Sequence, residues 1–463
     1  MSLKQKEDTK RIKELKHQSR RRSIQEGIFA TASFSFGSRY ISPFAIAINT
    51  SSALVALLGA IWGLLSPISQ MLSSRLIEKH SRKKIVMTFV FLETLMWIPF
   101  ILIGVLYYKG IMLHLLPIFI LIAYAFHVII SSIAGPAWFS WMGDIVDGDY
   151  RGRWFAKRSL IHGFVGIVLA LTASFALDYF KKINLTILGF ILLFILAMLS
   201  RFMSFRIFRK QYEPKIKLKR GYYFSFWDFV KQSPKNNFGR FAWYRATLSF
   251  ATAIAGSLIA VYLLRDLKLG YSVYMIVSLT GSFVSLFLLD FWGKISDKYG
   301  NYKVLLITSF LMPAIPLLWI LYPSPVYLAL VPSIVGSVAW AGFNLAAGNF
   351  TYDNVSPEKR GLALSYQNMF IGLGSFFGAG LGALLIKYLH TVSLKPIIII
   401  FIISGVLRTF AVLFWIPRLK EVSKKKKNLS VKTLENLIIK DAKPTLLEEA
   451  HQLMSIKSYM FNK

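Results

Sequence analysis

The chain has 463 residues, of which 55% are hydrophobic and 15% aromatic, and its mean hydropathy is +0.52. Soluble domains are roughly half apolar and about a quarter charged, so a composition with 17% charged residues indicates a membrane protein. The net charge of +33 would suggest a nucleic-acid partner in a soluble protein. Here the basic residues gather in tails and loops, so we expect no nucleic acid. The absence of cysteine excludes disulfides, thiolate metal sites and cysteine nucleophiles.

Residues 1–24 form a basic tail. Its Lys and Arg side chains predict a helix-permissive segment that faces anionic lipid at the cytoplasmic surface, although plain solvation of its first half is an alternative. Residues 1–22 are charged and polar and lead directly into an apolar segment of full length. We therefore identify no cleavable signal.

Apolar segments close to the ~20 residues that span a bilayer recur along the rest of the chain. We place them at residues 25–49, 52–73, 85–107, 113–141, 154–178, 184–207, 239–264, 270–291, 304–322, 325–350, 362–388 and 396–417. They predict an all-α membrane protein whose twelve transmembrane helices form two six-helix bundles, residues 25–207 and 239–417.

The distribution of Lys and Arg among the short loops predicts the orientation. Positively charged loops stay in the cytoplasm, which places both termini and the long linker, residues 208–238, on that side of a cell membrane. The linker continues from a basic run into the aromatic stretch 222–230, which we interpret as an interfacial helix. Residues 418–463 form a second basic cytoplasmic tail, to which the sequence assigns no role.

Three landmarks of the first half recur in the second half in the same order. The charged loop at residues 74–84 recurs at residues 293–303, an offset of 219 residues. An Arg-Gly turn after an acid, at residues 149–153, recurs at residues 358–361 with an offset of 209. A weaker pair, at residues 199–202 and 406–409, is offset by 207. Nearly constant spacing indicates an internal duplication, which is common in transporters.

The second charged loop carries a specific pattern of glycines, an acid and bases: Gly293, Asp297, Lys298, Gly300 and Lys303. This pattern resembles the signature loop of the major facilitator superfamily. In the first copy Glu78 replaces Asp297, and serines replace both glycines, which puts the close packing of that copy in doubt.

The resemblance covers residues 25–417 and implies a transporter whose two halves rock about a solute bound at the midplane. It also implies a cytoplasmic gate, in which each loop acid faces the partly positive amino terminus of a helix in the opposite half. The predicted gating residues are Glu78, Arg82, Arg151, Gly293, Asp297, Lys298, Gly300 and Arg360.

Polar side chains inside spans are costly, so each one is a candidate for function. The resemblance implies that spans one, four, seven and ten line the cavity. Arg39 and His127 each lie about 12 residues from one end of their spans, close to the middle of a ~30 Å core. Structural hydrogen bonding is the alternative for both. The predicted substrate-binding residues are Arg39, Tyr124, His127, Ser131, Trp138, Ser249, Thr252, Trp340 and Asn344.

Proton coupling is open at two of these positions. Glu93 is the one carboxylate that we place well within a span, where an ion pair with a neighbour such as Arg201 is the expected arrangement. His127 has the side chain whose ordinary pKa, near 6.5, suits a protonation cycle.

Phosphate-binding loops, zinc-protease motifs and serine-hydrolase motifs are absent from the sequence, so we expect neither an enzyme nor a cofactor. The sequence predicts a monomeric secondary transporter of a small solute, and Arg39 favours an organic anion or a polar metabolite. A lipid-handling protein and a non-transporting receptor or scaffold are the alternatives. Substrate, direction and coupling ion stay open.

Overall fold

The computed structural model describes residues 3–214, 225–356, 359–389 and 395–422, and within these ranges every regular element is a helix. The helices of the first half are α1 (Leu3–Phe36), α2 (Ile41–Ala47), α3 (Ser52–Lys79), α4 (Arg82–Leu95), α5 (Trp97–Tyr108), α6 (Leu116–Ile145), α7 (Gly148–Lys182) and α8 (Thr186–Arg209). Those of the linker and second half are α9 (Phe226–Gln232), α10 (Asn237–Gly256), α11 (Ile259–Val261), α12 (Tyr271–Tyr299), α13 (Asn301–Leu311), α14 (Ala314–Leu321), α15 (Pro325–Asn354), α16 (Arg360–Tyr388) and α17 (Pro396–Trp415).

In the described part of the chain, 11 helical segments are long and apolar enough to cross a membrane. They match the second to twelfth predicted spans closely, as Ser52–Lys79 does for 52–73 and Pro396–Arg418 for 396–417. The first predicted span, 25–49, is also helical but is broken at Gly37 into α1, a 3-10 turn (Ser38–Tyr40) and α2. The all-α multi-span architecture is therefore confirmed, and the predicted count of twelve is close to the eleven segments found, since the first span is interrupted.

Two other spans break at matching places in the repeat. The third predicted span divides into α4 and α5 at Met96, and the ninth divides into α13 and α14 at Met312 and Pro313. Pro99 and Pro313 each lack the backbone N–H that a helix interior needs, which explains why a helix bends or restarts nearby.

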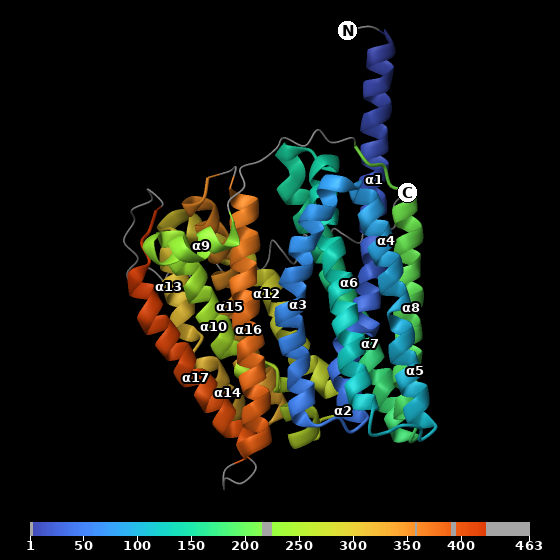
Figure 1. The fold of residues 1–463 in the computed structure, drawn as a ribbon, viewed down its shortest axis with the longest axis vertical. Coiled ribbons are helices and arrows are strands. Elements are labelled where there is room, and N and C mark those ends of the chain that lie inside the picture. Colours follow the sequence, from blue (N-terminus) through green and yellow to red (C-terminus); the bar gives the residue numbers. More distant parts are fainter. Residues whose placement is uncertain (1–2, 215–224, 357–358, 390–394, 423–463) are drawn as a thin grey trace. The chain divides into compact units, whose positions relative to one another are not determined.

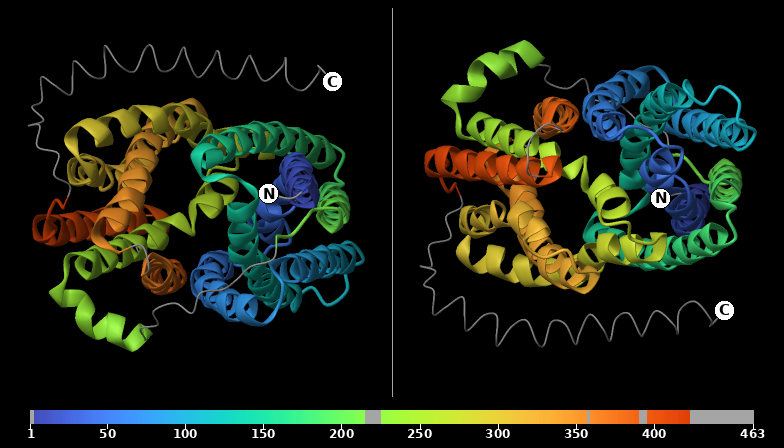
Figure 2. Two further views of the ribbon diagram at one scale, coloured as in Figure 1. Left: turned by 90° about the horizontal axis from the view of Figure 1, so that it is seen from above. Right: turned by 90° about the horizontal axis from the view of Figure 1, so that it is seen from below.

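The helices pack by elongated contacts along their lengths. In the first half α1 lies along α7 and α8, and α3 and α4 lie along α6, an arrangement that Figure 2 shows end on. A buried core of α4, α6, α7 and α8 centres on Trp141, Met142 and Ile145, all with no exposed surface. In the second half α13 packs against α15.

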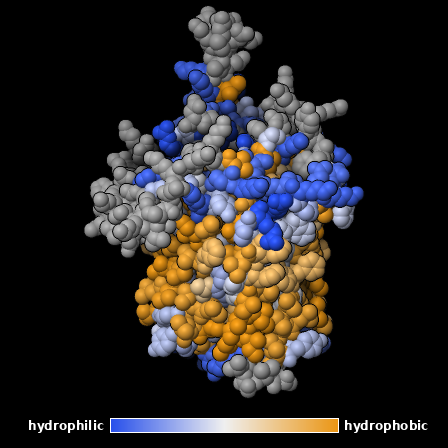
Figure 3. All heavy atoms as spheres, turned by 90° about the vertical axis from the view of Figure 1, so that its left-hand side faces the viewer, coloured by the Kyte–Doolittle hydropathy of each residue, from blue (hydrophilic) through white to orange (hydrophobic). Residues whose placement is uncertain are grey.

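Many large apolar side chains point away from this packing. Leu321, Phe139 and Phe410 are 72%, 65% and 64% exposed. On the face seen in Figure 3 hydrophobic residues cover a broad band, and most of the hydrophilic residues lie beyond one end of it. This is the surface of a protein whose solvent is lipid, because exposing these side chains to water would be unfavourable.

The described contacts divide the chain into two compact units. The first contains residues 1–221 together with 252–276 and 368–400, and the second contains residues 222–251, 277–367 and 401–463. The first unit therefore includes segments of α10, α12, α16 and α17 from the second half of the sequence.

Candidate functional site

The charged loop of each half is tied to the fourth helix of that half by one side-chain contact. Arg82 Nη1 donates to Asp144 Oδ2 at 2.7 Å in the first half. Asn301 Nδ2 donates to Asp353 Oδ2, also at 2.7 Å, in the second. Asn301 follows Arg82 by 219 residues and Asp353 follows Asp144 by 209, the same offsets as the sequence landmarks. We call the ends of the helices that carry these contacts the motif ends.

The two Arg-Gly turns repeat a second contact. Arg151 donates to the carbonyl oxygens of Gly143 (2.6 Å) and Val146 (3.3 Å) at the end of α6. Arg360 donates to those of Tyr352 (3.0 Å) and Val355 (3.1 Å) at the end of α15. These carbonyls lack helical partners because they close their helices. Arg151 and Arg360 thus fasten the turn that joins two successive spans.

The second glycine of the loop is required by its backbone in the second half. Gly300 has φ = +95°, and a Cβ there would lie 2.5 Å from Glu421 Oε2, which accepts from the N–H of Tyr302. In the first half Ser81 has φ = −64° and instead caps α4 by accepting from the N–H of Lys84. Gly293 meets nothing within 4 Å at its Cβ position, so packing in this structure does not require that glycine.

The loop acids themselves, Glu78 and Asp297, are exposed. Lys298 lies over the ring of Tyr299 at 5.4 Å. The predicted gating residues therefore all lie at the motif ends, and the approach of Glu78 and Asp297 to a helix of the opposite half stays a prediction.

Glu93 forms an ion pair with Arg201 at 2.6 Å, and both side chains are 12% exposed. This is the partner expected from the sequence. In the second half the equivalent Arg408 donates to the carbonyl of Met312 at 3.2 Å, and Met312 follows Glu93 by 219 residues. The weakest of the three sequence landmarks therefore marks a buried arginine in both halves.

Arg39 and His127 do not meet in the structure. His127 is 4% exposed and packs inside the first half against Trp97 and Phe100, with ring centroids 4.8 and 6.1 Å away. Arg39 lies in the break between α1 and α2, its guanidinium 5.0 Å from the ring of Phe34. Its Nε is buried and has no hydrogen-bond partner in the described part of the chain. Arg39 thus remains a candidate for solute binding, whereas the surroundings of His127 are those of a packed core residue.

The other predicted residues of α6 have mixed surroundings. Ser131 donates to the carbonyl of Val128 within its own helix, and Tyr124 is half-buried. Trp138 lies 4.3 Å from the guanidinium of Arg158.

Arg158 belongs to a buried polar cluster that the sequence analysis missed. Its Nη2 donates to Glu26 Oε1 at 3.0 Å, and Glu26 is 2% exposed. Ser204 donates to the other oxygen of Glu26 at 3.4 Å. Glu26 lies near the start of the first predicted span, where an acid reads as part of the charged tail. Its burial depends on α7 and α8, which no local pattern reveals.

Among the predicted residues of the second half, Ser249 and Trp340 are half-buried and Asn344 is exposed. Thr252 has a buried hydroxyl without a partner in the described residues. One turn before Ser249 on α10 lies Arg245, which donates to Gln367 Oε1 of α16 at 3.3 Å. The sequence analysis also missed this pair.

Within the first unit, segments of the two sequence halves meet at the ends opposite the motif ends. Asp178 of α7 accepts hydrogen bonds from the backbone N–H groups of Tyr271 (2.7 Å) and Ser272 (2.9 Å), and so caps α12. Arg265 donates to Thr50 O at 2.7 Å and to Ser52 Oγ at 2.8 Å. We call these two sets of contacts the latch.

Small residues allow α3 to approach the second half closely beside the latch. A Cβ on Gly63 would lie 3.0 Å from the carbonyl oxygen of Gly372, and one on Gly59 would lie 3.1 Å from Ser257 Cβ. Glycine at such crossings lets helix backbones come together.

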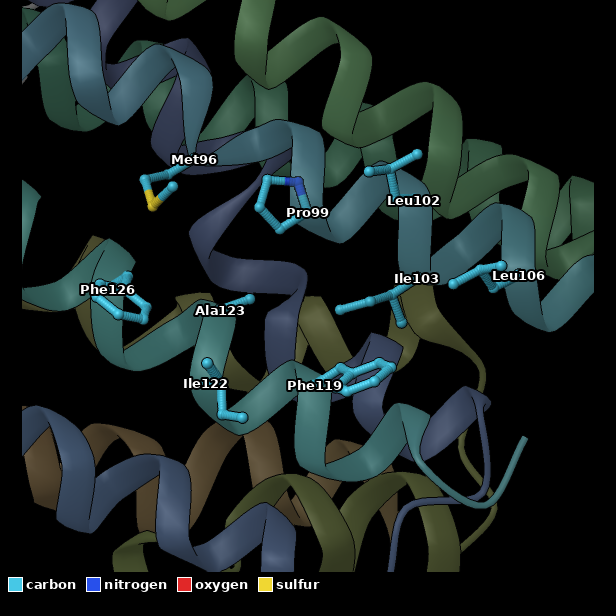
Figure 4. Close-up of a pocket in the computed structure, with 9 residues that line it drawn as sticks. All are labelled: Met96, Pro99, Leu102, Ile103, Leu106, Phe119, Ile122, Ala123 and Phe126. Atoms are coloured by element: carbon cyan, nitrogen blue, oxygen red, sulfur yellow. The ribbon is translucent and has the colours of Figure 1, made fainter. Parts of the chain in front are cut away.

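An apolar pocket of about 330 Å³ lies between α5 and α6. Figure 4 shows its lining, which includes Leu102, Ile122 and Phe126, and these three side chains are about half exposed. A lipid-facing groove lined this way suits an acyl chain and offers no polar group to a water-soluble solute.

Comparisons with known proteins support the resemblance. Residues 241–454 match the family model described as Major Facilitator Superfamily. No curated protein matches the sequence.

Solved structures of transporters share the fold at low sequence identity. A bacterial homologue of the iron transporter ferroportin, in an inward-facing state, is 14% identical with a TM-score of 0.65, over 86% of this chain and 98% of that one. The nucleoside transporter NupG is 12% identical with a TM-score of 0.63, over 87% and 99%. A bacterial homologue of the human lysosomal transporter Spinster is 12% identical with a TM-score of 0.61, over 90% and 99%.

The side-chain contacts that recur at offsets of 219 and 209 residues, the family match and the common fold agree with one another. We conclude that residues 241–454 match the major facilitator superfamily and that the chain as a whole shares the fold of multi-pass membrane transporters.

Proposed function

We propose that this protein is a secondary transporter that moves a small polar solute, and preferably an organic anion, by alternating access. The observation that carries the proposal is the latch. It joins segments of both sequence halves through the hydrogen bonds of Asp178 and Arg265, and the glycine contacts of α3 lie beside it. Contacts of this kind can break and reform at modest cost, since a net hydrogen bond contributes only about 0.5–1.5 kcal/mol.

The positive-inside rule favours a cytoplasmic position for the motif ends and for both termini, in a cell membrane. The latch then closes the outer side. Opening on one side must accompany closure on the other, so we assign Glu78 and Asp297 to the inner gate, where each acid would face the positive end of a helix dipole.

Arg39 supports an anionic solute. An arginine retains its proton in proteins, and a cation at this depth needs an acid, carbonyls, water or a ligand. Its position in a helix break leaves nearby backbone groups without regular helical partners, an arrangement that transporters use to bind solutes.

The proposal is tested in two steps with the full-length protein. A thermal-shift screen against small acids, sugars, nucleosides and amino acids identifies solutes that raise the melting temperature, because a ligand that binds only the folded state stabilises it. Counterflow of the same labelled solute is then measured in proteoliposomes, and empty liposomes are the control. Binding without counterflow would favour a receptor, and stabilisation by lipids alone would favour a lipid-handling protein.

The role of Arg39 is tested with the solute that the screen yields. Arg39→Lys keeps the charge but removes the planar fork, so we expect affinity to fall by about 1–3 kcal/mol. An unchanged affinity with a lower melting temperature would make Arg39 structural.

A further inference from the structure

Arg245 is a half-buried cation that has no acidic partner among the described residues. None of the ion pairs in the described part of the chain includes it. Its one hydrogen bond there, 3.3 Å from Nη1, goes to the neutral Gln367. A guanidinium has five N–H donors, so most of its capacity is not used within the described residues.

The equivalent residues of the first half show how a buried arginine at this place in the repeat is neutralised. Arg245 follows Glu26 by 219 residues, and Gln367 follows Arg158 by 209, the offsets that relate the other repeated contacts. In the first half the cation of α7 is neutralised by the acid of α1 at 3.0 Å. In the second half the cation is on α10, and a neutral amide is in the place of its partner. Within this repeated pair, the positive charge of Arg245 is therefore not neutralised by its partner.

Gln367 adds a second donor beside that charge. It has no exposed surface, and its Oε1 accepts from Arg245 and, at 3.5 Å, from the hydroxyl of Thr351. Because a guanidinium can only donate, the amide oxygen must face Arg245, and the Nε2 group points elsewhere. That Nε2 is buried and has no partner in the described part of the chain.

Both side chains lie within helices that are long and apolar enough to cross a membrane. Arg245 is eight residues after Asn237, where α10 begins, and Gln367 is seven residues after Arg360, where α16 begins. At ~1.5 Å per residue these positions are about 10–12 Å along their helices. A charge at such depth is expensive and is a functional group by default.

We propose that Arg245 and Gln367 form an oxyanion-binding site that receives the carboxylate or phosphate group of a small water-soluble solute. The inference rests on the proposed transport function and names its substrate class. The planar guanidinium matches two oxygens of a carboxylate or phosphate at once. The amide of Gln367 holds the guanidinium in place and supplies a further N–H.

The test is a thermal-shift measurement on the purified full-length protein at constant ionic strength. The probes are inorganic phosphate, succinate and lactate, with succinamide as the uncharged analogue of succinate. We expect at least one oxyanion to raise the melting temperature and succinamide to leave it unchanged. Arg245→Gln should raise the oxyanion concentration that gives half of the maximal temperature shift about tenfold to a hundredfold. This is the range for the loss of hydrogen bonds to charged groups. The matched control is Arg240→Gln on the same helix, which should respond as the wild type does.

A second variant keeps the test valid if Arg245→Gln folds poorly. Gln367→Glu places a carboxylate beside Arg245 and recreates the internal pair of the first half. We expect it to raise the melting temperature without ligand and to abolish the oxyanion response, because the guanidinium is occupied and the added charge repels an anion. A purely structural role for Arg245 would instead leave the oxyanion response of this variant intact.

The outcomes separate this inference from the proposed function. A solute that stabilises wild type and Arg245→Gln equally, and that exchanges in proteoliposomes, would overturn the oxyanion site and leave the transporter standing. A wild type that responds to none of the oxyanions overturns the site as well. A response confined to phosphatidylglycerol, relative to phosphatidylcholine, would assign Arg245 to a lipid headgroup and contradict a soluble solute. Loss of counterflow for every stabilising solute would contradict transport itself.

Discussion

Asn301 donates to Asp353 at the same 2.7 Å that separates Arg82 from Asp144 in the other half. A neutral amide has replaced a guanidinium, yet the contact between the loop and the fourth helix of the half is kept. Arg82 makes more contacts than the acid alone provides. It is 1% exposed and also donates to the carbonyls of Ser140 and Pro214.

Loss of Arg82 should therefore destabilise the protein more than loss of Asn301. We expect Arg82→Ala to lower the free energy of unfolding by about 2–4 kcal/mol, since it leaves buried acceptors and a carboxylate without their donor. Asn301→Ala should cost about 1–2 kcal/mol. Melting temperatures of the purified variants measure the difference. Equal losses would mean that the two contacts carry equal weight despite their different charge.

Asp297→Asn tests the inner gate. The substitution keeps the side-chain volume and removes the charge, so we expect solute exchange to fall at least about tenfold while the protein inserts and purifies normally. Glu78→Gln should have a smaller effect, because its loop contains serine where Gly300 adopts φ = +95°. Exchange by Asp297→Asn at the wild-type rate would reduce the loop to an ordinary turn.

The linker helix α9 should respond to acid. Ser225 and Asp228 form a capping box, and hydrogen bonds from the hydroxyl and then the backbone N–H of Ser225 hold the pKa of the Asp228 carboxyl below its ordinary value. A lowered pKa means that the cap contributes stability above the unfolded value of about 3.9 and loses it as the pH falls through the folded value.

A spin label at Lys231, introduced as the protein's one cysteine, reports on this helix. We expect its mobility to rise only in strongly acidic solution, and Asp228→Asn to show the raised mobility already at neutral pH, because an amide does not titrate. Mobility that does not depend on pH in either protein would show that docking of Phe226 and Phe229 against Tyr366 is sufficient to hold α9.

Long-range periodicity made the fold predictable from the sequence. Each span is about as long as a bilayer requires or longer, so its existence does not depend on exact boundaries, and the duplicated loops indicate that the two halves contain the same number of helices. The ion pair between Glu93 and Arg201 could also be predicted from the sequence. A single acid and a single base deep within two spans stabilise each other by forming an ion pair.

The candidate site was less predictable from the sequence. The position of a residue along a helix gives its depth, but it does not say which neighbouring helix the side chain faces. His127 lies at the expected depth but points into Trp97 and Phe100. Arg245 lies close to the beginning of its predicted span, where a basic residue is expected to contact the membrane surface. Only its contact with α16 shows that it is held inside the fold.

The central claim is that the latch opens during transport, and a reversible cross-link tests it most directly. The chain has no cysteine, and the Cβ position of Gly59 lies 3.1 Å from Ser257 Cβ, near the roughly 3.5–4.5 Å of a disulfide. The variant Gly59→Cys with Ser257→Cys, and each single variant as a control, is reconstituted in proteoliposomes. The measurement is exchange of the solute found by thermal shift, before and after oxidation. The account predicts that oxidation stops exchange in the double variant alone and that a reductant restores it. Undiminished exchange by the fully cross-linked protein would contradict alternating access through the latch.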